Sequence, residues 1–196
     1  RLLVSTRQSI TAVDDLLSKE LLKKIKDYSW INDYMLFTGR YLGNYYFVLM
    51  FPNLMQFELF ETYMPGSFWN PTMNIEMAHD YETFRGRTSY ASNCAGGYYA
   101  SRLPICEYLN SIKRQATAIV FRFELPEYWI GLGVFVVRES MRKTLKTQPL
   151  IFDTKEKLIS KTKELIFNKF KFDITNTLKK SVLLENLKNQ KKLFEF

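Results

Sequence analysis

The chain contains one histidine, His79, which stands beside Asp80 and close to Glu76 and Glu82. An imidazole flanked by carboxylates is typical of a general base or a metal ligand, so His79, Asp80 and Glu82 are weak catalytic candidates. The alternative is a loop histidine that makes a single hydrogen bond. With one His and two distant Cys, the chain does not favour zinc, and magnesium would need the carboxylates to converge. We therefore predict no metal site in these residues.

A second candidate is the run Asn93-Cys-Ala-Gly-Gly, which leads into a predicted helix. Its two glycines allow the backbone to approach a ligand closely, and N–H groups at a helix start attract anions. Arginines lie just upstream and about one turn inside the helix. This pattern predicts a phosphate cradle, although paired glycines also serve tight helix packing. The predicted phosphate-binding residues are Arg85, Arg87, Gly96, Gly97 and Arg102.

Arg138, Arg142 and Lys146 recur every four residues along a predicted helix over 133–146. Such a stripe either follows a nucleic-acid backbone or forms the solvated face of an amphipathic helix. We include Arg138 and Arg142 among the candidate nucleic-acid contacts.

Glu61 shares strand parity with Phe57 and Leu59. A carboxylate on an apolar face is either paired, with Arg122 as one candidate partner, or held for function. Glu61 is therefore a fourth weak catalytic candidate.

These residues need helices and strands to position them, and the pattern predicts an α+β fold with an antiparallel sheet flanked by helices. Turn residues at Gly39 and Pro52–Asn53 suggest a meander of the first three strands. Residues 65–97 show weak periodicity and are predicted to be irregular. The expected helices begin near Thr11 and cover 97–114, 133–146, 153–167 and 173–190, and the expected strands cover 34–38, 40–51, 54–64 and 117–125. We divide the chain into a core at 1–150, a Lys-rich helical appendage at 151–189 and a terminal peptide at 190–196.

Composition narrows the function classes. The 196 residues include 16% aromatics, which excludes a largely disordered chain, and the net charge of +8 fits an anionic partner. Every Arg lies before residue 151, whereas the remaining residues are basic through Lys alone. Because Arg suits bidentate phosphate contacts, we expect a phosphate site in the first part. The Walker A loop, the G-x-S-x-G elbow and the zinc-deaminase signature are missing from the sequence.

The sequence also predicts a compartment. The two cysteines, Cys94 and Cys106, are too far apart for a CxxC pair, which favours a reduced intracellular context. The sequence has no signal peptide and no apolar run of about 18 residues, so we expect no membrane contact. Its first residue is Arg rather than Met, which suggests a fragment.

Several blocks of the sequence resemble the archaeal Nre family, which is associated with DNA repair. The resemblance runs from about Val13 to Lys146. It rests on Tyr63-Met-Pro-Gly-Ser, Tyr81-Glu-Thr-Phe-Arg-Gly-Arg-Thr-Ser-Tyr-Ala, Gly96-Gly-Tyr-Tyr-Ala-Ser-Arg-Leu, Glu107-Tyr-Leu, Lys113-Arg-Gln-Ala, Leu125-Pro-Glu-Tyr-Trp and Gly131-Leu-Gly-Val-Phe-Val-Val-Arg-Glu. It implies a cytoplasmic, nucleoid-associated archaeal protein. It also implies a cysteine metal site in an N-terminal part that lies outside this sequence, and we expect no cofactor in the present chain.

The end of the sequence, Gln190-Lys-Lys-Leu-Phe-Glu-Phe196, resembles the peptide Gln-x-x-aliphatic-x-x-aromatic that binds the sliding clamp (PCNA), and Nre proteins carry such a peptide. One helical turn would place Leu193 and Phe196 side by side for one apolar groove, with Gln190 hydrogen-bonding nearby. The copy ends after one aromatic residue. The alternative is a frayed tail.

Two main functions follow from these patterns. The first is a repair-associated protein that binds DNA and is recruited to the sliding clamp by residues 190–196. The second is an enzyme acting on nucleic acid or a nucleotide at a pocket formed by residues 65–102. A protein-interaction scaffold without DNA contact is a third option.

Overall fold

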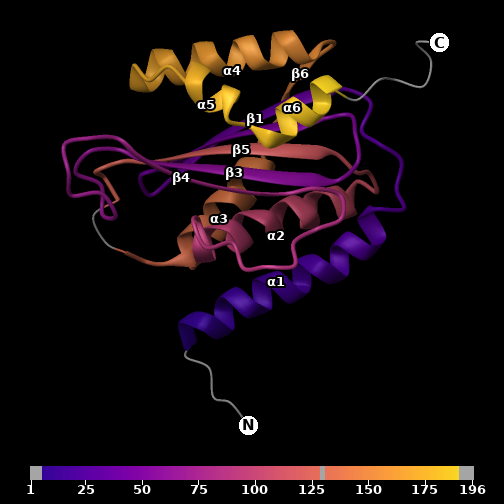
Figure 1. Ribbon diagram of the computed structural model, residues 1–196, viewed down its shortest axis with the longest axis horizontal. Coiled ribbons are helices and arrows are strands. Elements are labelled where there is room, and N and C mark those ends of the chain that lie inside the picture. Colours follow the sequence, from indigo (N-terminus) through magenta and orange to yellow (C-terminus); the bar gives the residue numbers. More distant parts are fainter. Residues whose placement is uncertain (1–5, 129–130, 190–196) are drawn as a thin grey trace.

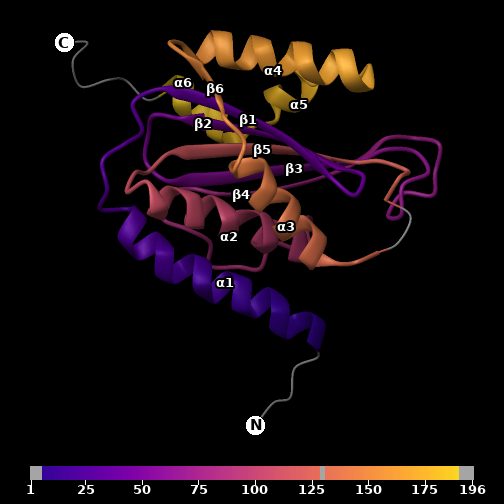
Figure 2. The same cartoon turned by 180° about the vertical axis from the view of Figure 1, so that it is seen from behind.

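A computed structural model describes residues 6–128 and 131–189, and within these ranges the chain builds a six-stranded sheet in the order β4-β3-β5-β2-β1-β6. Figures 1 and 2 show helices on both sides of this sheet. The strands are β1 (Tyr34–Tyr41), β2 (Asn44–Phe51), β3 (Gln56–Tyr63), β4 (Glu76–Glu82), β5 (Thr117–Glu124) and β6 (Leu150–Phe152). The helices are α1 (Thr6–Ile25), α2 (Ala95–Ser111), α3 (Val134–Leu145), α4 (Lys155–Phe170), α5 (Thr175–Lys179) and α6 (Val182–Asn189).

The α+β class is confirmed, but the predicted meander is wrong. β1 and β2 form an antiparallel hairpin, whereas β5 inserts between β2 and β3 and pairs in parallel with β3. All eight residues of β5 are buried, which suits a central strand covered on both faces. The sheet is therefore mixed, with one parallel pair among the described strands.

The hairpin turn lies at Leu42 and Gly43, where the backbone has φ of 47° and 71°, and not at Gly39 as predicted. Gly39 lies inside β1, where an added Cβ would come within 2.3 Å of Thr144 Oγ1 on α3. The glycine at this position thus permits a close helix–strand approach rather than a turn.

The sequence analysis missed two strands, the short β6 and β4, which lies in the segment predicted to be irregular. β4 pairs with β3 alone and occupies the sheet edge. Its sequence, Glu-Met-Ala-His-Asp-Tyr-Glu, is half polar and only partly buried, so its strand pattern is weak.

Alternating side chains divide the sheet into two faces. One face, here called the α2 face, packs under α2 and α3, with α1 outside them, and buries Phe57, Leu59 and Val120. The opposite face, here called the α4 face, packs under α4, α5 and α6 and buries Phe60, Ile119 and Phe121. Because both faces of the sheet are covered, seven of the eight residues of β3 and all eight of β5 are buried.

The Lys-rich segment at 151–189 was described from the sequence as an appendage, and the structure shows a closer association. Its first two residues belong to β6, and its helices bury side chains in the core of the α4 face. These buried side chains are Leu158, Ile166, Ile174, Leu183 and Leu184. The segment thus covers one whole face of the sheet, whose aromatic residues would otherwise meet water.

Two further expectations concern cysteines and membranes. Cys94 and Cys106 are both free and buried, and burial raises the pKa of the Cys106 thiol to about 12, so this thiol is poorly reactive. None of the helices in the described part of the chain is long and apolar enough to cross a membrane.

Candidate functional site

The start of α2, which the sequence predicts as a phosphate cradle, already holds an anion from the protein itself. The backbone N–H groups of Asn93 and Cys94 donate to Oδ2 of Asp80 at 3.0 and 2.8 Å. The other Asp80 oxygen pairs with Arg87 Nη1 at 3.1 Å. Asp80, a predicted catalytic candidate, therefore takes the place in which the sequence pattern would put a phosphate.

The paired glycines at this helix start serve close packing. A Cβ on Gly96 would come within 2.6 Å of Val134 Cγ1 on α3, and a Cβ on Gly97 within 2.4 Å of Glu61 Oε1 on β3. At both positions a side chain would clash with a neighbouring element of the fold. This was the alternative that the sequence left open.

Arg87 shapes the loop that connects β4 to α2. Its guanidinium donates to the carbonyl oxygens of Tyr81, Ser89 and Tyr90 at 2.7, 3.2 and 3.1 Å. One side chain therefore ties the end of β4 to the middle of the loop. Arg85, two residues earlier, is exposed and does not share in these contacts.

Arg102 is 1% exposed and joins three elements. It donates from Nη1 to Glu82 Oε2 at 2.8 Å and from Nη2 to Asp15 Oδ1 on α1. Burial acts against the charge of the guanidinium, but Glu82 and the surrounding groups raise the pKa of Arg102, so it stays ionised. Its Nε has no hydrogen-bond partner among the described residues.

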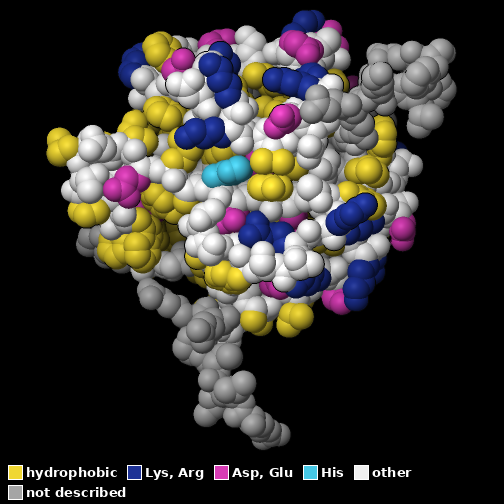
Figure 3. All heavy atoms as spheres, viewed as in Figure 1, with side chains coloured by type: hydrophobic (Ala, Val, Ile, Leu, Met, Phe, Trp, Pro, Cys, Tyr) yellow, Lys and Arg dark blue, Asp and Glu magenta, His cyan; other side chains and the backbone are white. Residues whose placement is uncertain are grey.

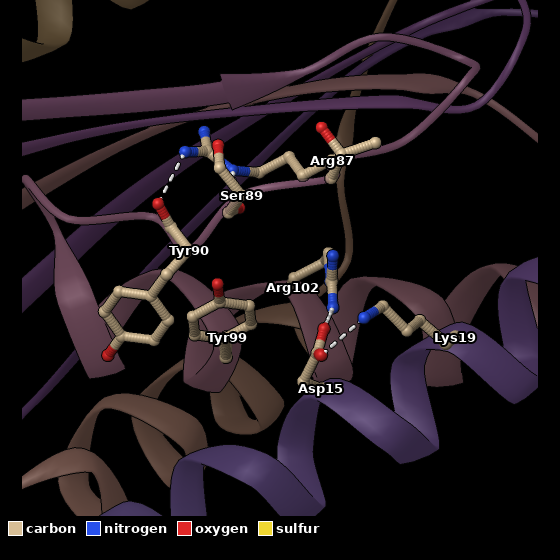
Figure 4. A pocket seen from close by; sticks show the side chains of 8 residues that line it. Asp15, Lys19, Arg87, Ser89, Tyr90, Tyr99 and Arg102 are labelled. Carbon is tan, nitrogen blue, oxygen red and sulfur yellow. Dashed lines mark hydrogen bonds and ion pairs between the residues drawn. The ribbon is translucent and has the colours of Figure 1, made fainter.

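A cavity of about 190 Å³ opens between α1, α2 and the 87–90 segment (Figure 4). Its lining combines cations, a carboxylate, hydroxyl groups and two aromatic rings. The lining residues are Asp15, Lys19, Arg87, Thr88, Ser89, Tyr90, Tyr99 and Arg102. Two of the predicted phosphate-binding residues, Arg87 and Arg102, thus meet at one hollow, whereas Arg85, Gly96 and Gly97 are not part of its lining.

His79 lies on β4 and not in a loop. Its Nε2 is 2.8 Å from Glu58 Oε1, and its ring stacks on Phe60 with centroids 4.2 Å apart. It lines a second hollow of about 480 Å³, together with Asp80, Glu82 and the 86–89 loop. In the described residues, His, Cys, Asp and Glu do not gather in a group that could hold a metal ion.

Glu61 is paired as the sequence suggested. Arg122 Nη1 donates to Glu61 Oε1 at 2.6 Å, and the same guanidinium contacts Asn44 and Glu124. All four residues are buried. The cluster ties β2, β3 and β5 together beneath the start of α2, which indicates a structural role for Glu61.

The two arginines of α3 are also paired. Arg138 contacts Asp14 on α1, and Arg142 forms a two-pronged pair with Glu107 on α2 at 2.6 and 2.8 Å. Arg142 also donates to Glu139 at 2.7 Å. These ion pairs hold α1, α2 and α3 to one another, and nucleic-acid contact by Arg138 and Arg142 stays a prediction. The clamp-binding candidates Gln190, Leu193 and Phe196 lie outside the described residues.

Comparison with known proteins assigns the family. The sequence model described as "Archaeal Nre, N-terminal" matches residues 1–70, and that described as "Archaeal Nre, C-terminal" matches residues 82–196. The chain belongs to the archaeal Nre family. The C-terminal match extends beyond Lys146, where the resemblance read from the sequence ended.

Curated relatives carry the same family name. The chain is 38% identical to DNA repair protein NreB of Archaeoglobus fulgidus over its full length, which is 49% of that protein. It is 42% identical to DNA repair protein NreA of Haloferax volcanii over 72% of the chain and 34% of that protein. It is 37% identical to DNA repair protein NreA of Archaeoglobus fulgidus over 86% of the chain and 43% of that protein. The chain thus spans half or less of the length of these relatives. No solved structure matches it.

The two Nre regions are interleaved in this chain. The N-terminal region supplies α1 and β1–β3, and the C-terminal region supplies β5, which lies between β2 and β3. Separating the regions would leave the facing edges of β2 and β3 unpaired. The cavity is also shared, because Asp15 and Lys19 come from the N-terminal region and the other lining residues from the C-terminal region.

Of the residues that line this site, the sequence analysis proposed only Arg87 and Arg102, and it did not single out Asp15, Lys19 or Tyr90. In the sequence, Asp15 and Lys19 have the spacing expected of the polar face of an amphipathic helix. The chain has twelve tyrosines, and Tyr90 lies in a segment without clear periodicity. The contact of α1 with α2 brings Asp15 and Lys19 to Arg102, which is 87 residues from Asp15.

Proposed function

We propose that this Nre chain acts in DNA repair, binds DNA and is recruited to the sliding clamp (PCNA) by residues 190–196. The repair role rests on the relatives, three proteins named as DNA repair proteins at 37–42% identity. The recruitment rests on the sequence Gln190-Lys-Lys-Leu-Phe-Glu-Phe196.

The two apolar anchors of the terminal peptide account for only part of the free energy that clamp binding needs. Burial of Leu193 and Phe196 would contribute about 3–6 kcal/mol before the cost of ordering the peptide. Micromolar binding needs about 8 kcal/mol. Backbone contacts and the amide of Gln190 would supply the difference.

The recruitment is tested by calorimetry of the full chain with an archaeal sliding clamp. Deletion of residues 190–196 is expected to abolish binding, and Leu193→Ala with Phe196→Ala to do the same. Glu195→Ala is the matched control, because this side chain lies between the two anchors and should leave the affinity nearly unchanged. An affinity that survives the deletion rejects the recruitment.

DNA contact is best supported on the α4 face. Figure 3 shows dark-blue basic side chains over α4 and α6 at the top of that view, and the basic residues of these helices are all Lys. Five exposed lysines here form no ion pair with any residue in the described part of the chain: Lys169, Lys171, Lys179, Lys180 and Lys188. Positive charge that is not neutralised within the fold is what a phosphate backbone attracts.

One observation favours the alternative of an enzyme acting on nucleic acid or a nucleotide. Arg87 and Arg102 do meet carboxylates, Asp80, Asp15 and Glu82, beside two neighbouring hollows. Conversion of a labelled nucleotide or oligonucleotide that His79→Asn abolishes would support this function. Equal conversion by both proteins, or none by either, would reject a role of His79 in catalysis.

A further inference from the structure

Tyr90 presents an aromatic ring at the edge of the cavity formed by α1, α2 and the 87–90 segment. The ring is 55% exposed and stacks on Tyr99 with centroids 5.2 Å apart and an interplanar angle of 30°. Its position is fixed from two sides. Its carbonyl accepts from Arg87 Nη2, and the next residue, Ala91, donates from its N–H to Tyr99 Oη at 2.9 Å. An exposed ring held in this way is a ready stacking platform.

The floor of the cavity offers both donors and acceptors. Asp15 lies on α1 and faces Arg102 and Lys19 in Figure 4, with Lys19 Nζ 2.7 Å from Asp15 Oδ2. Arg102 is buried and holds Asp15, so the accessible charged groups are those of Asp15 and Lys19. Ser89 and Thr88 add hydroxyl groups to the same lining.

The size and continuity of the hollow set limits on the ligand. At about 190 Å³ the cavity is smaller than the roughly 300–1,000 Å³ of most small-molecule pockets. It shares Arg87, Thr88 and Ser89 with the neighbouring hollow of about 480 Å³. A ligand with one flat ring system in the cavity and a polar extension along the second hollow fits this shape.

We propose that this cavity binds a nucleobase, which stacks on Tyr90 and is read by Asp15 and Lys19, while the buried Arg102 holds Asp15 in place. A base carries hydrogen-bond donors and acceptors on one edge, which matches a carboxylate placed beside an ammonium. Binding of a base does not depend on the proposed function. The proposed function bears only on whether the base belongs to a nucleic-acid strand or to a free nucleotide.

A simple phosphate fits the cavity less well than a base. Burial acts against the charge of Asp15, but hydrogen bonds from Lys19 and Arg102 hold the pKa of this carboxyl below its ordinary value, so an anion would meet a negative charge. A phosphate also has no planar ring that could stack on Tyr90. Both features favour a neutral, planar and polar ring.

Calorimetric titration of the full chain tests the inference with dAMP, dGMP, dCMP and TMP, with deoxyribose 5-phosphate as the ligand without a base, and with a short single-stranded oligonucleotide. At least one nucleotide or the oligonucleotide should bind where the sugar phosphate does not. Tyr90→Ala should weaken this binding about 5- to 150-fold, the range of one lost base stack. Tyr90→Phe should retain it because the phenyl ring also stacks.

Phe167→Ala is the matched control, since this ring is 51% exposed and lies on α4, on the opposite face of the sheet. Its affinity should equal that of the parent chain. Binding of the oligonucleotide alone assigns the base to a strand, and binding of mononucleotides assigns it to a free nucleotide. The inference is overturned by equal binding of deoxyribose 5-phosphate, by no binding of any base, or by equal effects of Tyr90→Ala and Phe167→Ala. Clamp binding is measured separately and does not depend on these outcomes.

Discussion

Five arginines are paired with carboxylates on the α2 side of the sheet, whereas the exposed basic residues of α4, α5 and α6 are all lysines. The paired arginines are Arg87, Arg102, Arg122, Arg138 and Arg142. Arg102 and Arg122 are almost completely buried. The lysines of α4, α5 and α6 that form ion pairs do so only with neighbours in sequence, among the residues that the structure describes.

The difference follows from the chemistry of the two side chains. A guanidinium has five donors in a planar fork and is weakly hydrated, so it satisfies two or three buried acceptors at once. An ammonium is strongly hydrated and stays in water. These five arginines are therefore neutralised within the fold, whereas the exposed lysines Lys169, Lys171, Lys179, Lys180 and Lys188 form no ion pair in the described part of the chain. The expectation that the Arg-containing part of the chain contacts phosphate stays a prediction.

The largest expected effect is on the buried cluster of Arg122. Arg122→Met would leave Glu61 and Glu124 buried without their cation, and such unpaired charges cost about 3–5 kcal/mol. We expect a loss of that size in the free energy of unfolding, measured by urea denaturation at pH 7.

The control for Arg122→Met adds Glu61→Gln to the same chain. Removing one of the unpaired charges should recover part of the lost stability. A loss below about 1 kcal/mol for Arg122→Met alone would mean that the cluster is hydrated and does not hold the strands together.

The Glu61–Arg122 pair also shows what the sequence can predict. Strand parity placed Glu61 on an apolar face, and a strong strand at 117–125 offered one Arg within reach. In the structure the two residues are register partners on the parallel strands β3 and β5. Local periodicity was sufficient here because both strands are long and mostly buried.

The phosphate cradle shows where such prediction ends. Of its five predicted residues, Arg87 and Arg102 meet at one hollow, whereas Arg85, Gly96 and Gly97 do not line it. Two carboxylates of the protein itself already bind these groups. Asp80 reaches the start of α2 from β4, and Asp15 reaches Arg102 from α1. A sequence read along the chain does not show which carboxylate folds back onto which cation. For the same reason it did not show β5 inserting between β2 and β3.

The second prediction places DNA contact on the lysines of α5. If the chain binds DNA there, Lys179→Ala with Lys180→Ala should lower the slope of log affinity against log salt concentration by about 2, since each phosphate contact contributes about 0.9. The measurement is a fluorescence-anisotropy titration of duplex DNA at several salt concentrations.

Lys143→Ala with Lys146→Ala is the matched control, because both lysines are exposed at the end of α3 on the other side of the sheet. We expect the slope of this variant to equal that of the parent chain. The reverse result, with the α3 pair lowering the slope and the α5 pair not, would return DNA contact to the α2 side and to the helix that carries Arg138 and Arg142.

The third prediction concerns Glu58, a buried carboxylate that points to the α4 face and whose partners include no arginine. It accepts from Ser181 Oγ at 2.5 Å and from the N–H groups of Val182 and Leu183 at 2.9 and 3.3 Å. Ser181 Oγ in turn accepts from Leu184 N–H at 3.1 Å, as an N-cap of α6.

Ser181→Ala is therefore expected to lower the free energy of unfolding by about 1–2 kcal/mol, the upper range for a lost N-cap. Thr154→Ala, which removes the exposed N-cap of α4, is the comparison and should cost about 0.5–1 kcal/mol. An equal loss for both variants would show that Glu58 does not need the Ser181 hydroxyl.

The smallest expected effect is the dependence of stability on pH through Asp15. Burial alone would raise the pKa of this carboxyl, but hydrogen bonds from Lys19 and Arg102 outweigh it and lower the pKa below the ordinary 3.8. A carboxyl with a lowered pKa in the folded state stabilises the fold above pH 3.8, and this contribution is lost as the pH falls through the lower value. Asp15→Asn should thus be less stable than the parent chain at pH 7, by under about 1 kcal/mol for a partly exposed pair.

The difference between Asp15→Asn and the parent chain should shrink as the pH falls below 3.8. Urea denaturation at pH 7, 5 and about 3 measures it. Asp153→Asn is the control, since the pKa of Asp153 is lowered mainly by its hydrogen bond with Lys157 on an exposed turn of α4, where solvent screens the pair. A difference for Asp15→Asn that widens toward low pH would mean that this carboxyl is destabilising in its ionised form. At neutral pH the ionised Asp15 would then lower the stability of the fold. This is expected of a residue that is kept for a ligand and not for the fold.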